Sequence, residues 1–102
     1  MEKKFRPMKA LEEMRNILRQ NRTIPNPDTT VLTYVERTLG YTGISKKYNG
    51  LLKAYDEIGN LTKEDCYKIA DSMAMGLSCD IDEQEKYFEK FREVLDSDFD
   101  EA

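Results

Sequence analysis

Apolar residues recur every three or four positions along most of the chain, the spacing that places them on one face of an α-helix. The two-residue alternation of a half-buried strand does not persist over any segment long enough to build a sheet. Short breaks rich in Gly, Pro and Asn separate the apolar stripes. The pattern therefore predicts an all-α fold, a compact antiparallel bundle of four to five short helices.

The first apolar stripe predicts a helix from about residue 7 to residue 22. Its members are Met8, Leu11, Met14, Ile17 and Leu18. Pro25 and Pro27 then interrupt the pattern, because proline does not continue a helix interior. Asn26 followed by Pro27 has the order of an N-cap and a first helical residue, so a second helix is expected to begin there and to end at Gly40. This helix should bury Val31, Leu32, Val35 and Leu39.

The third stripe is the most complete in the chain and predicts one helix from about residue 45 to residue 58, ended by Gly59. Its members are Ile44, Tyr48, Leu51, Leu52, Tyr55 and Ile58. The pair Asn49-Gly50 interrupts the stripe, and such pairs are typical of turns. We favour a single helix here, since the apolar spacing continues on both sides of the pair.

Two further helices each begin with a capping sequence. Thr62 and Asp65 occupy the N-cap and N3 positions of a variant capping box, and Asp80 with Glu83 repeats this pattern. The helix after Thr62 is expected to bury Cys66, Ile69, Ala70, Met73 and Leu77. The last helix should place Tyr87, Phe88, Phe91, Val94 and Leu95 on one face. At the end of the first of these helices, we interpret Met73, Ala74, Met75 and Gly76 as core packing; the alternative is that Met75 and Gly76 allow a close approach of another helix or of a partner.

With 102 residues, the chain has the usual size of one domain, with a frayed basic arm at residues 1–6 and a frayed acidic tail at residues 97–102. It has neither a signal sequence nor an apolar run of the roughly 20 residues that a membrane span needs, so we expect it in the cytoplasm. It contains two cysteines, Cys66 and Cys79, and no histidine, which excludes the usual zinc sites and a Cys–His nucleophile. We interpret the cysteines as reduced, buried small hydrophobes; a disulfide between them is the alternative.

Charge is divided along the sequence. Residues 1–53 carry 11 basic and 5 acidic side chains, a net charge of +6. Residues 54–102 carry 5 basic and 15 acidic side chains, a net charge of −10, which together give the whole-chain value of −4. This division predicts either two surfaces with different partners or two halves that neutralise each other within the fold.

The basic half is a candidate surface for nucleic acid or for a protein partner, because clustered Lys and Arg side chains can contact phosphates. Its candidate residues are Lys3, Lys4, Arg6, Arg15, Arg19, Arg22, Lys46 and Lys47. The acidic half offers a candidate protein-binding surface on the last helix, at Asp82, Glu85, Glu89 and Glu93. Like charges four residues apart on a helix repel one another, so capping alone does not explain how far this run extends.

Catalytic chemistry is absent from the sequence patterns. No motif of a nucleotide-binding loop, a nucleophile elbow or a metal site is present, so we expect no enzyme activity, no cofactor, no metal and no small-molecule substrate. Four tyrosines, Tyr34, Tyr41, Tyr48 and Tyr55, lie seven residues apart. We interpret their spacing as coincidence; a tyrosine ridge that contacts a partner is the alternative.

These observations favour a small binding or regulatory protein that docks on a protein partner through charged surfaces, as an inhibitor or adaptor. The first alternative is a DNA- or RNA-binding regulator that uses the basic half. The second is an immunity-type protein that neutralises a toxin, an analogy of size and helical fold with bacteriocin immunity proteins. Small size and high charge are also typical of accessory proteins of phages and mobile elements.

Overall fold

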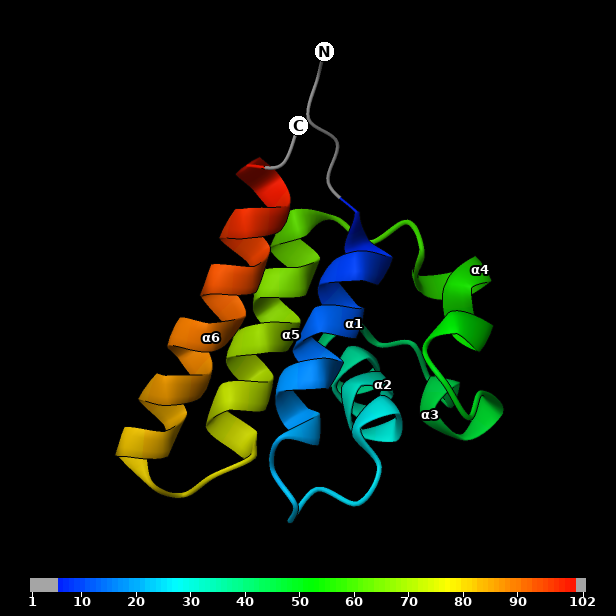
Figure 1. The fold of residues 1–102 in the computed structure, drawn as a ribbon. Helices are drawn as coiled ribbons and strands as arrows, with labels where there is room; N and C mark the ends of the chain where they lie inside the picture. Colours follow the sequence, from blue (N-terminus) through cyan, green and yellow to red (C-terminus); the bar gives the residue numbers. More distant parts are fainter. Residues whose placement is uncertain (1–5, 101–102) are drawn as a thin grey trace.

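A computed structural model describes the fold of residues 6–100 and the side chains of residues 6–96. Over these residues the chain forms six α-helices and one short 3-10 helix, with no strand, which confirms the predicted all-α bundle (Figure 1). The helices are α1 (Pro7–Arg19), α2 (Pro27–Leu39), α3 (Ile44–Lys47), η1 (Leu52–Ala54), α4 (Tyr55–Ile58), α5 (Lys63–Gly76) and α6 (Ile81–Asp100).

Helix α1 lies at the centre of the arrangement, where it contacts α2, α4, α5 and α6. Helices α1 and α5 run in the same direction in Figure 1, and α6 runs back antiparallel to both. Helix α2 lies behind this layer and contacts α1 and α5, while α3 packs against α2. The core that results contains the largest buried side chains of four helices, among them Leu11, Met14, Leu32, Met73 and Phe91.

Most of the predicted helix boundaries are confirmed. The Asn26 side chain accepts a hydrogen bond from the Thr29 N–H at the start of α2, and Gly40 ends this helix in the left-handed conformation. Thr62 and Asp65 form the reciprocal capping box of α5. At the start of α6 the Asp80 carboxylate accepts from a backbone N–H, whereas Glu83 accepts from the Ser78 hydroxyl instead of closing a box.

The first helix is shorter than the sequence predicts, because α1 ends at Arg19 rather than near residue 22. The Asn21 side-chain oxygen Oδ1 accepts from both the backbone N–H and the hydroxyl of Thr23, and its side-chain amide donates to the Tyr87 hydroxyl at 2.8 Å. Such local side-chain bonds compete with the helical backbone pattern. Arg22 therefore lies in the turn after α1 and does not share a helix face with Arg15 and Arg19.

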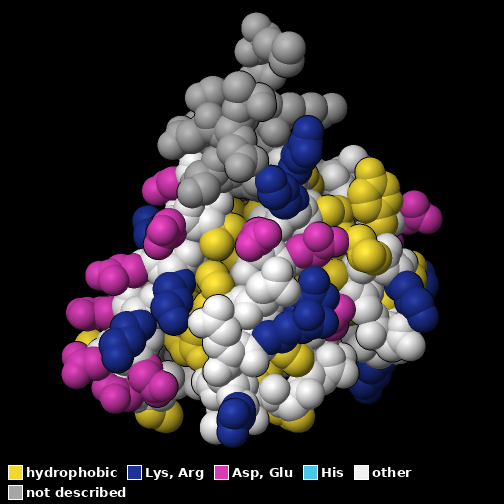
Figure 2. Space-filling model, in the orientation of Figure 1, with side chains coloured by type: hydrophobic (Ala, Val, Ile, Leu, Met, Phe, Trp, Pro, Cys, Tyr) yellow, Lys and Arg dark blue, Asp and Glu magenta, His cyan; other side chains and the backbone are white. Residues whose placement is uncertain are grey.

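The single helix predicted for residues 45–58 is wrong. The chain forms α3, leaves the helical conformation at Tyr48 (φ −124°, ψ 139°), and resumes as η1 and α4 after the Asn49-Gly50 pair. Leu51 is nonetheless buried, as the apolar stripe predicts, while Leu52 and Tyr55 are exposed. Figure 2 shows apolar side chains at the surface in this part of the molecule.

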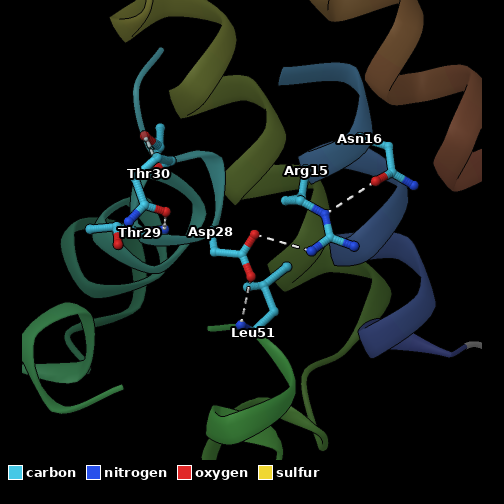
Figure 3. Close-up of polar contacts among 7 residues, drawn as sticks. Arg15, Asn16, Asp28, Thr29, Thr30 and Leu51 are labelled. Atoms are coloured by element: carbon cyan, nitrogen blue, oxygen red, sulfur yellow. Dashed lines mark hydrogen bonds and ion pairs between the residues drawn. The ribbon is translucent and has the colours of Figure 1, made fainter. Parts of the chain in front are cut away.

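One carboxylate fixes the break. Asp28, in the first turn of α2, accepts the Leu51 N–H at 3.2 Å and pairs with the Arg15 guanidinium at 3.1 Å (Figure 3). The side chains of Arg15 and Asp28 are only 18% and 20% exposed, so this pair is largely shielded from water. Asp28 thereby joins α1, α2 and the segment before η1, a role that its place in the first turn of α2 does not reveal.

Tyr34 of α2 lies against Gly76 at the end of α5. A Cβ atom at Gly76 would lie 2.2 Å from the Tyr34 hydroxyl oxygen, so the missing side chain is what lets the tyrosine fit. Gly76 therefore allows the close approach of a helix that was the alternative for this patch, while Met73 and Ala74 are buried in the core and Met75 is exposed. Because Tyr34 is buried, the four tyrosines with seven-residue spacing do not form one exposed ridge.

The cysteines behave differently from each other. Cys66 is buried and Cys79 is exposed, and neither forms a disulfide, so the alternative of a disulfide and the expected burial of Cys79 are both wrong. Cys79 is exposed because it lies in the loop between α5 and α6.

Only parts of the two ends that we expect to be frayed are among the described residues. Arg6 directly precedes α1, and the rest of the predicted basic arm, residues 1–5, lies outside the described residues. The predicted acidic tail at residues 97–102 begins inside α6, which extends to Asp100. Within the described part of the chain, no helix is long and apolar enough to cross a membrane.

Candidate functional site

The structure does not gather the predicted basic residues into one free surface. Lys3 and Lys4 lie outside the described residues, and Arg6 is exposed before α1. Arg19 is exposed at the end of α1, and Lys46 is exposed on α3, which packs on α2. Basic side chains are consequently spread over the face shown in Figure 2.

Two of the predicted basic residues are engaged within the fold. Arg15 pairs with Asp28 and also donates from Nε to the Asn16 side chain at 3.1 Å. Lys47 pairs with Glu57 at 3.2 Å, and its Nζ lies 5.3 Å from the centre of the Tyr48 ring. Both cations therefore already have partners within the fold, and a ligand would have to compete for them.

The contact of Lys47 and Tyr48 with Glu57 of α4 also shifts the pKa values of these three residues. Hydrogen bonds from Tyr48 and then Lys47 lower the pKa of Glu57. The hydrogen bond to Glu57 raises the pKa of Lys47 and of Tyr48. All three shifts favour the ion pair as it stands, but the groups are exposed, so its contribution to stability is small.

The predicted acidic residues form a continuous surface. Asp82, Glu85, Glu89 and Glu93 are all exposed, and at 100° per residue they fall within an arc of about 80° opposite the buried Phe91. We call these four residues the acidic ridge. None of the four carboxylates has an ion pair or hydrogen bond to another described residue. Figure 2 shows acidic side chains gathered along the edge of the molecule over α6.

Cations flank the acidic ridge on both sides. Arg92 lies on the side of α5, where it pairs with Asp71 at 3.3 Å. Its guanidinium also lies 5.6 Å from the centre of the Tyr67 ring. Tyr67 donates a hydrogen bond to Asp96, which together with burial raises the pKa of Tyr67 to about 12.

On the other side of the acidic ridge, α1 and α6 enclose a hollow of about 330 Å³. We call it the α1–α6 pocket. Its polar lining comprises Arg22, Lys86, Lys90, Glu83, Gln20 and Asn21, and its apolar lining Ile17 and the Tyr87 ring. Tyr87 is held by the hydrogen bond from Asn21 and stacks on Phe91 with a centroid separation of 5.6 Å.

The α1–α6 pocket was missed in the sequence analysis, which counted Lys86 and Lys90 in the acidic half and placed Arg22 within the first predicted helix. The two lysines are four residues apart on α6, at the border between the acidic ridge and the side that faces α1. The sequence did carry a local signal that Lys86 lies near the packed side of α6, because Lys86 directly precedes Tyr87, which is buried. That signal indicates a cationic pocket only together with Arg22, and the turn after α1 is what brings Arg22 next to the two lysines.

Few of the ion pairs between described side chains join the two oppositely charged halves of the sequence. Among the ion pairs Arg15–Asp28, Lys47–Glu57 and Arg92–Asp71, only the second joins the basic half to the acidic half. In particular, none of these ion pairs involves a carboxylate of the acidic ridge. Among the described residues there is also no group of three or more acidic or cysteine side chains placed to hold a metal ion.

Comparison of the chain with family models, with curated proteins and with solved structures gives no match. The surfaces described above are therefore the basis for a functional conclusion.

Proposed function

We propose that this protein is a non-catalytic binding protein whose acidic ridge docks on a basic surface of another protein, as an adaptor or inhibitor. The observation that carries the proposal is the exposure of four carboxylates on one helix face, none of which forms an ion pair or hydrogen bond with another described residue. Like charges at this spacing destabilise an isolated helix, and a basic partner relieves that repulsion. A charged face of this kind also accelerates association with an oppositely charged partner.

Apolar side chains beside the acidic ridge supply the anchoring that charge alone does not. Ile81, the first residue of α6, is 69% exposed, and Met75 near the end of α5 is 60% exposed. Both flank the loop at residues 77–80, at the end where the acidic ridge begins. Apolar groups that become buried at the centre of an interface carry much of the binding energy, while charges outside it govern the rate of association.

Nucleic-acid binding is the less supported function. Arg15 and Lys47 are engaged in ion pairs, and the remaining described candidates are distributed between the residue before α1, α1 itself, the turn after it and α3. Phosphate contacts released by salt would have to come from this dispersed set. An immunity-type role would be one form of protein docking and would use the same acidic ridge.

The proposal is tested with a variant in which three of the four carboxylates of the acidic ridge are neutralised and with a control that has the same change of charge. The ridge variant carries Glu85→Gln, Glu89→Gln and Glu93→Gln; the control carries Glu13→Gln, Asp56→Asn and Glu64→Gln, three exposed acids elsewhere. Immobilised wild-type and variant proteins are exposed to a cell extract, and the retained proteins are identified and purified. Association rates are then measured at about 50 and 200 mM salt.

We expect a retained protein whose association slows by about tenfold with the ridge variant at low salt and is nearly unchanged with the control. Equal effects of the two variants would assign the attraction to net charge and reject the acidic ridge as the docking surface. Retention of nucleic acid, with a steep loss between the two salt concentrations, would favour the alternative function.

A further inference from the structure

The α1–α6 pocket carries an excess of positive charge that the fold does not use. Arg22, Lys86 and Lys90 line it, and none of the three has an ion pair or hydrogen bond to another described residue. Glu83 is the one carboxylate in the lining, and it accepts a hydrogen bond from the Ser78 hydroxyl at 2.7 Å. Three cations around one hollow repel one another unless an anion enters between them.

We propose that the α1–α6 pocket binds a small phosphomonoester. Arg and Lys side chains form strong charge-assisted hydrogen bonds with phosphate oxygens, and an Arg guanidinium can donate two in parallel. Here Arg22 approaches from the turn after α1, while Lys86 and Lys90 project from successive turns of α6. A phosphate group between these two elements would be contacted from two sides.

The polar wall of the pocket is already positioned. The Tyr87 hydroxyl oxygen accepts the Asn21 amide at 2.8 Å, so its own hydrogen is free to donate elsewhere. Asn21 is fixed in turn by Thr23, which donates to its carbonyl oxygen at 2.7 and 3.0 Å. This arrangement supplies donors for a ligand anion without a large rearrangement of the turn.

The apolar lining and the volume favour an ester over bare phosphate. Ile17 and the ring of Tyr87 offer a surface for the carbon part of the ligand. The hollow of about 330 Å³ lies near the lower end of the roughly 300–1,000 Å³ of small-molecule sites. The acidic ridge borders the pocket, and its carboxylates repel ligands that extend over α6, which also favours a small anion. This proposal does not depend on the docking function of the acidic ridge.

The test is a two-dimensional amide NMR titration of the ¹⁵N-labelled full chain with phenyl phosphate, with inorganic phosphate, and with potassium chloride at matched ionic strength. We expect saturable shifts confined to residues 17–23 and 83–91, tighter binding of phenyl phosphate than of inorganic phosphate, and no saturable shift with chloride. Lys90→Gln and Arg22→Gln should each weaken phenyl phosphate binding by about tenfold, the loss of one charge-assisted hydrogen bond. Lys68→Gln removes the same charge from an exposed position on α5 and should change binding less than twofold.

Several results would overturn the proposal. Shifts that do not saturate, that spread over the surface, or that chloride reproduces would show that the pocket does not select phosphate. An equal effect of Lys68→Gln would point to net charge. Binding of single-stranded DNA that Arg19→Gln or Lys46→Gln weakens as much as Lys90→Gln would assign these cations to a nucleic-acid surface instead. Since the substituted side chains are exposed, thermal unfolding should confirm that every variant keeps the wild-type stability.

Discussion

Helix α5 and the segment at residues 44–58 have the same kind of apolar spacing, yet one is a continuous helix and the other is three short pieces. Helix α5 has a complete capping box at its start and no turn-forming pair within it. The segment at residues 44–58 contains Asn49-Gly50 and is bonded at Leu51 by a carboxylate from α2. The comparison shows that an apolar stripe determines which side chains are buried but does not by itself determine the backbone between them.

The two regions are also held in different ways. The Arg92–Asp71 ion pair between α5 and α6 is exposed. It joins two helices that their packed apolar faces already hold together. The broken segment depends instead on the largely buried Asp28, which satisfies a guanidinium and a backbone N–H at once. A buried group with two partners is costly to remove, because both partners lose their bonds.

The largest effect is expected for Asp28→Ala. The substitution leaves the Arg15 guanidinium and the Leu51 N–H unpaired and removes an acid from the first turn of α2, so we expect a loss of about 2–3 kcal/mol in the free energy of unfolding. Urea denaturation followed by circular dichroism measures it. The control is Asp71→Ala in the exposed pair with Arg92, which should cost less than about 1 kcal/mol. Similar losses for the two variants would refute the distinction between the regions.

A smaller effect is expected for Gly76→Ala on the side of α5. The added Cβ would lie 2.2 Å from the Tyr34 hydroxyl oxygen, and the overpacking outweighs the better helix propensity of alanine. We expect a net loss of about 1 kcal/mol. In a Tyr34→Phe background the hydroxyl is absent, so the cost of Gly76→Ala should fall by at least half. An unchanged cost in this double-mutant cycle would show that the tyrosine is not what opposes the side chain.

Alkaline pH should act more strongly on α5 than on the broken segment, where the raised pKa values of Lys47 and Tyr48 belong to an exposed contact. The pKa of Tyr67 is raised from 10.0 to about 12 by its hydrogen bond to Asp96, so the neutral phenol is favoured in the folded state. Its stabilising contribution is therefore complete below pH 10 and is lost as the pH rises from about 10 to about 12. Tyr67→Phe should flatten the stability profile over this window. The exposed Tyr55 of α4 provides the control, and Tyr55→Phe should leave the profile as it is in the wild type.

The smallest effect is expected for Gly50→Ala. An added Cβ would meet only the Asp28 Oδ2 atom, at 3.5 Å, and the backbone here does not have a positive φ, so we expect a change below about 0.5 kcal/mol in the free energy of unfolding. If the break depended mainly on the freedom of this glycine, the variant would instead be strongly destabilised or gain helix content by circular dichroism. Either result would contradict the assignment of the break to Asp28.

The sequence by itself determined the features that depend on neighbouring residues. Asn26, Gly40 and the Thr62–Asp65 box mark helix ends because their bonds span only a few residues. Buried positions such as Val35 and Ile69 follow from helical periodicity. The acidic ridge is equally local, since residues on one face of α6 recur every three or four positions.

Tertiary structure alone decided the features that join distant residues. The Asp28 contacts span 13 and 23 positions, and they converted a predicted helix into three pieces and engaged a predicted surface arginine. The bond from Asn21 to Tyr87 spans 66 positions and joins the turn after α1 to α6, where Arg22 lines the same pocket as the lysines of α6. No local propensity reports such partners, because a side chain's hydrogen bonds and charge neighbours are fixed only when the helices pack.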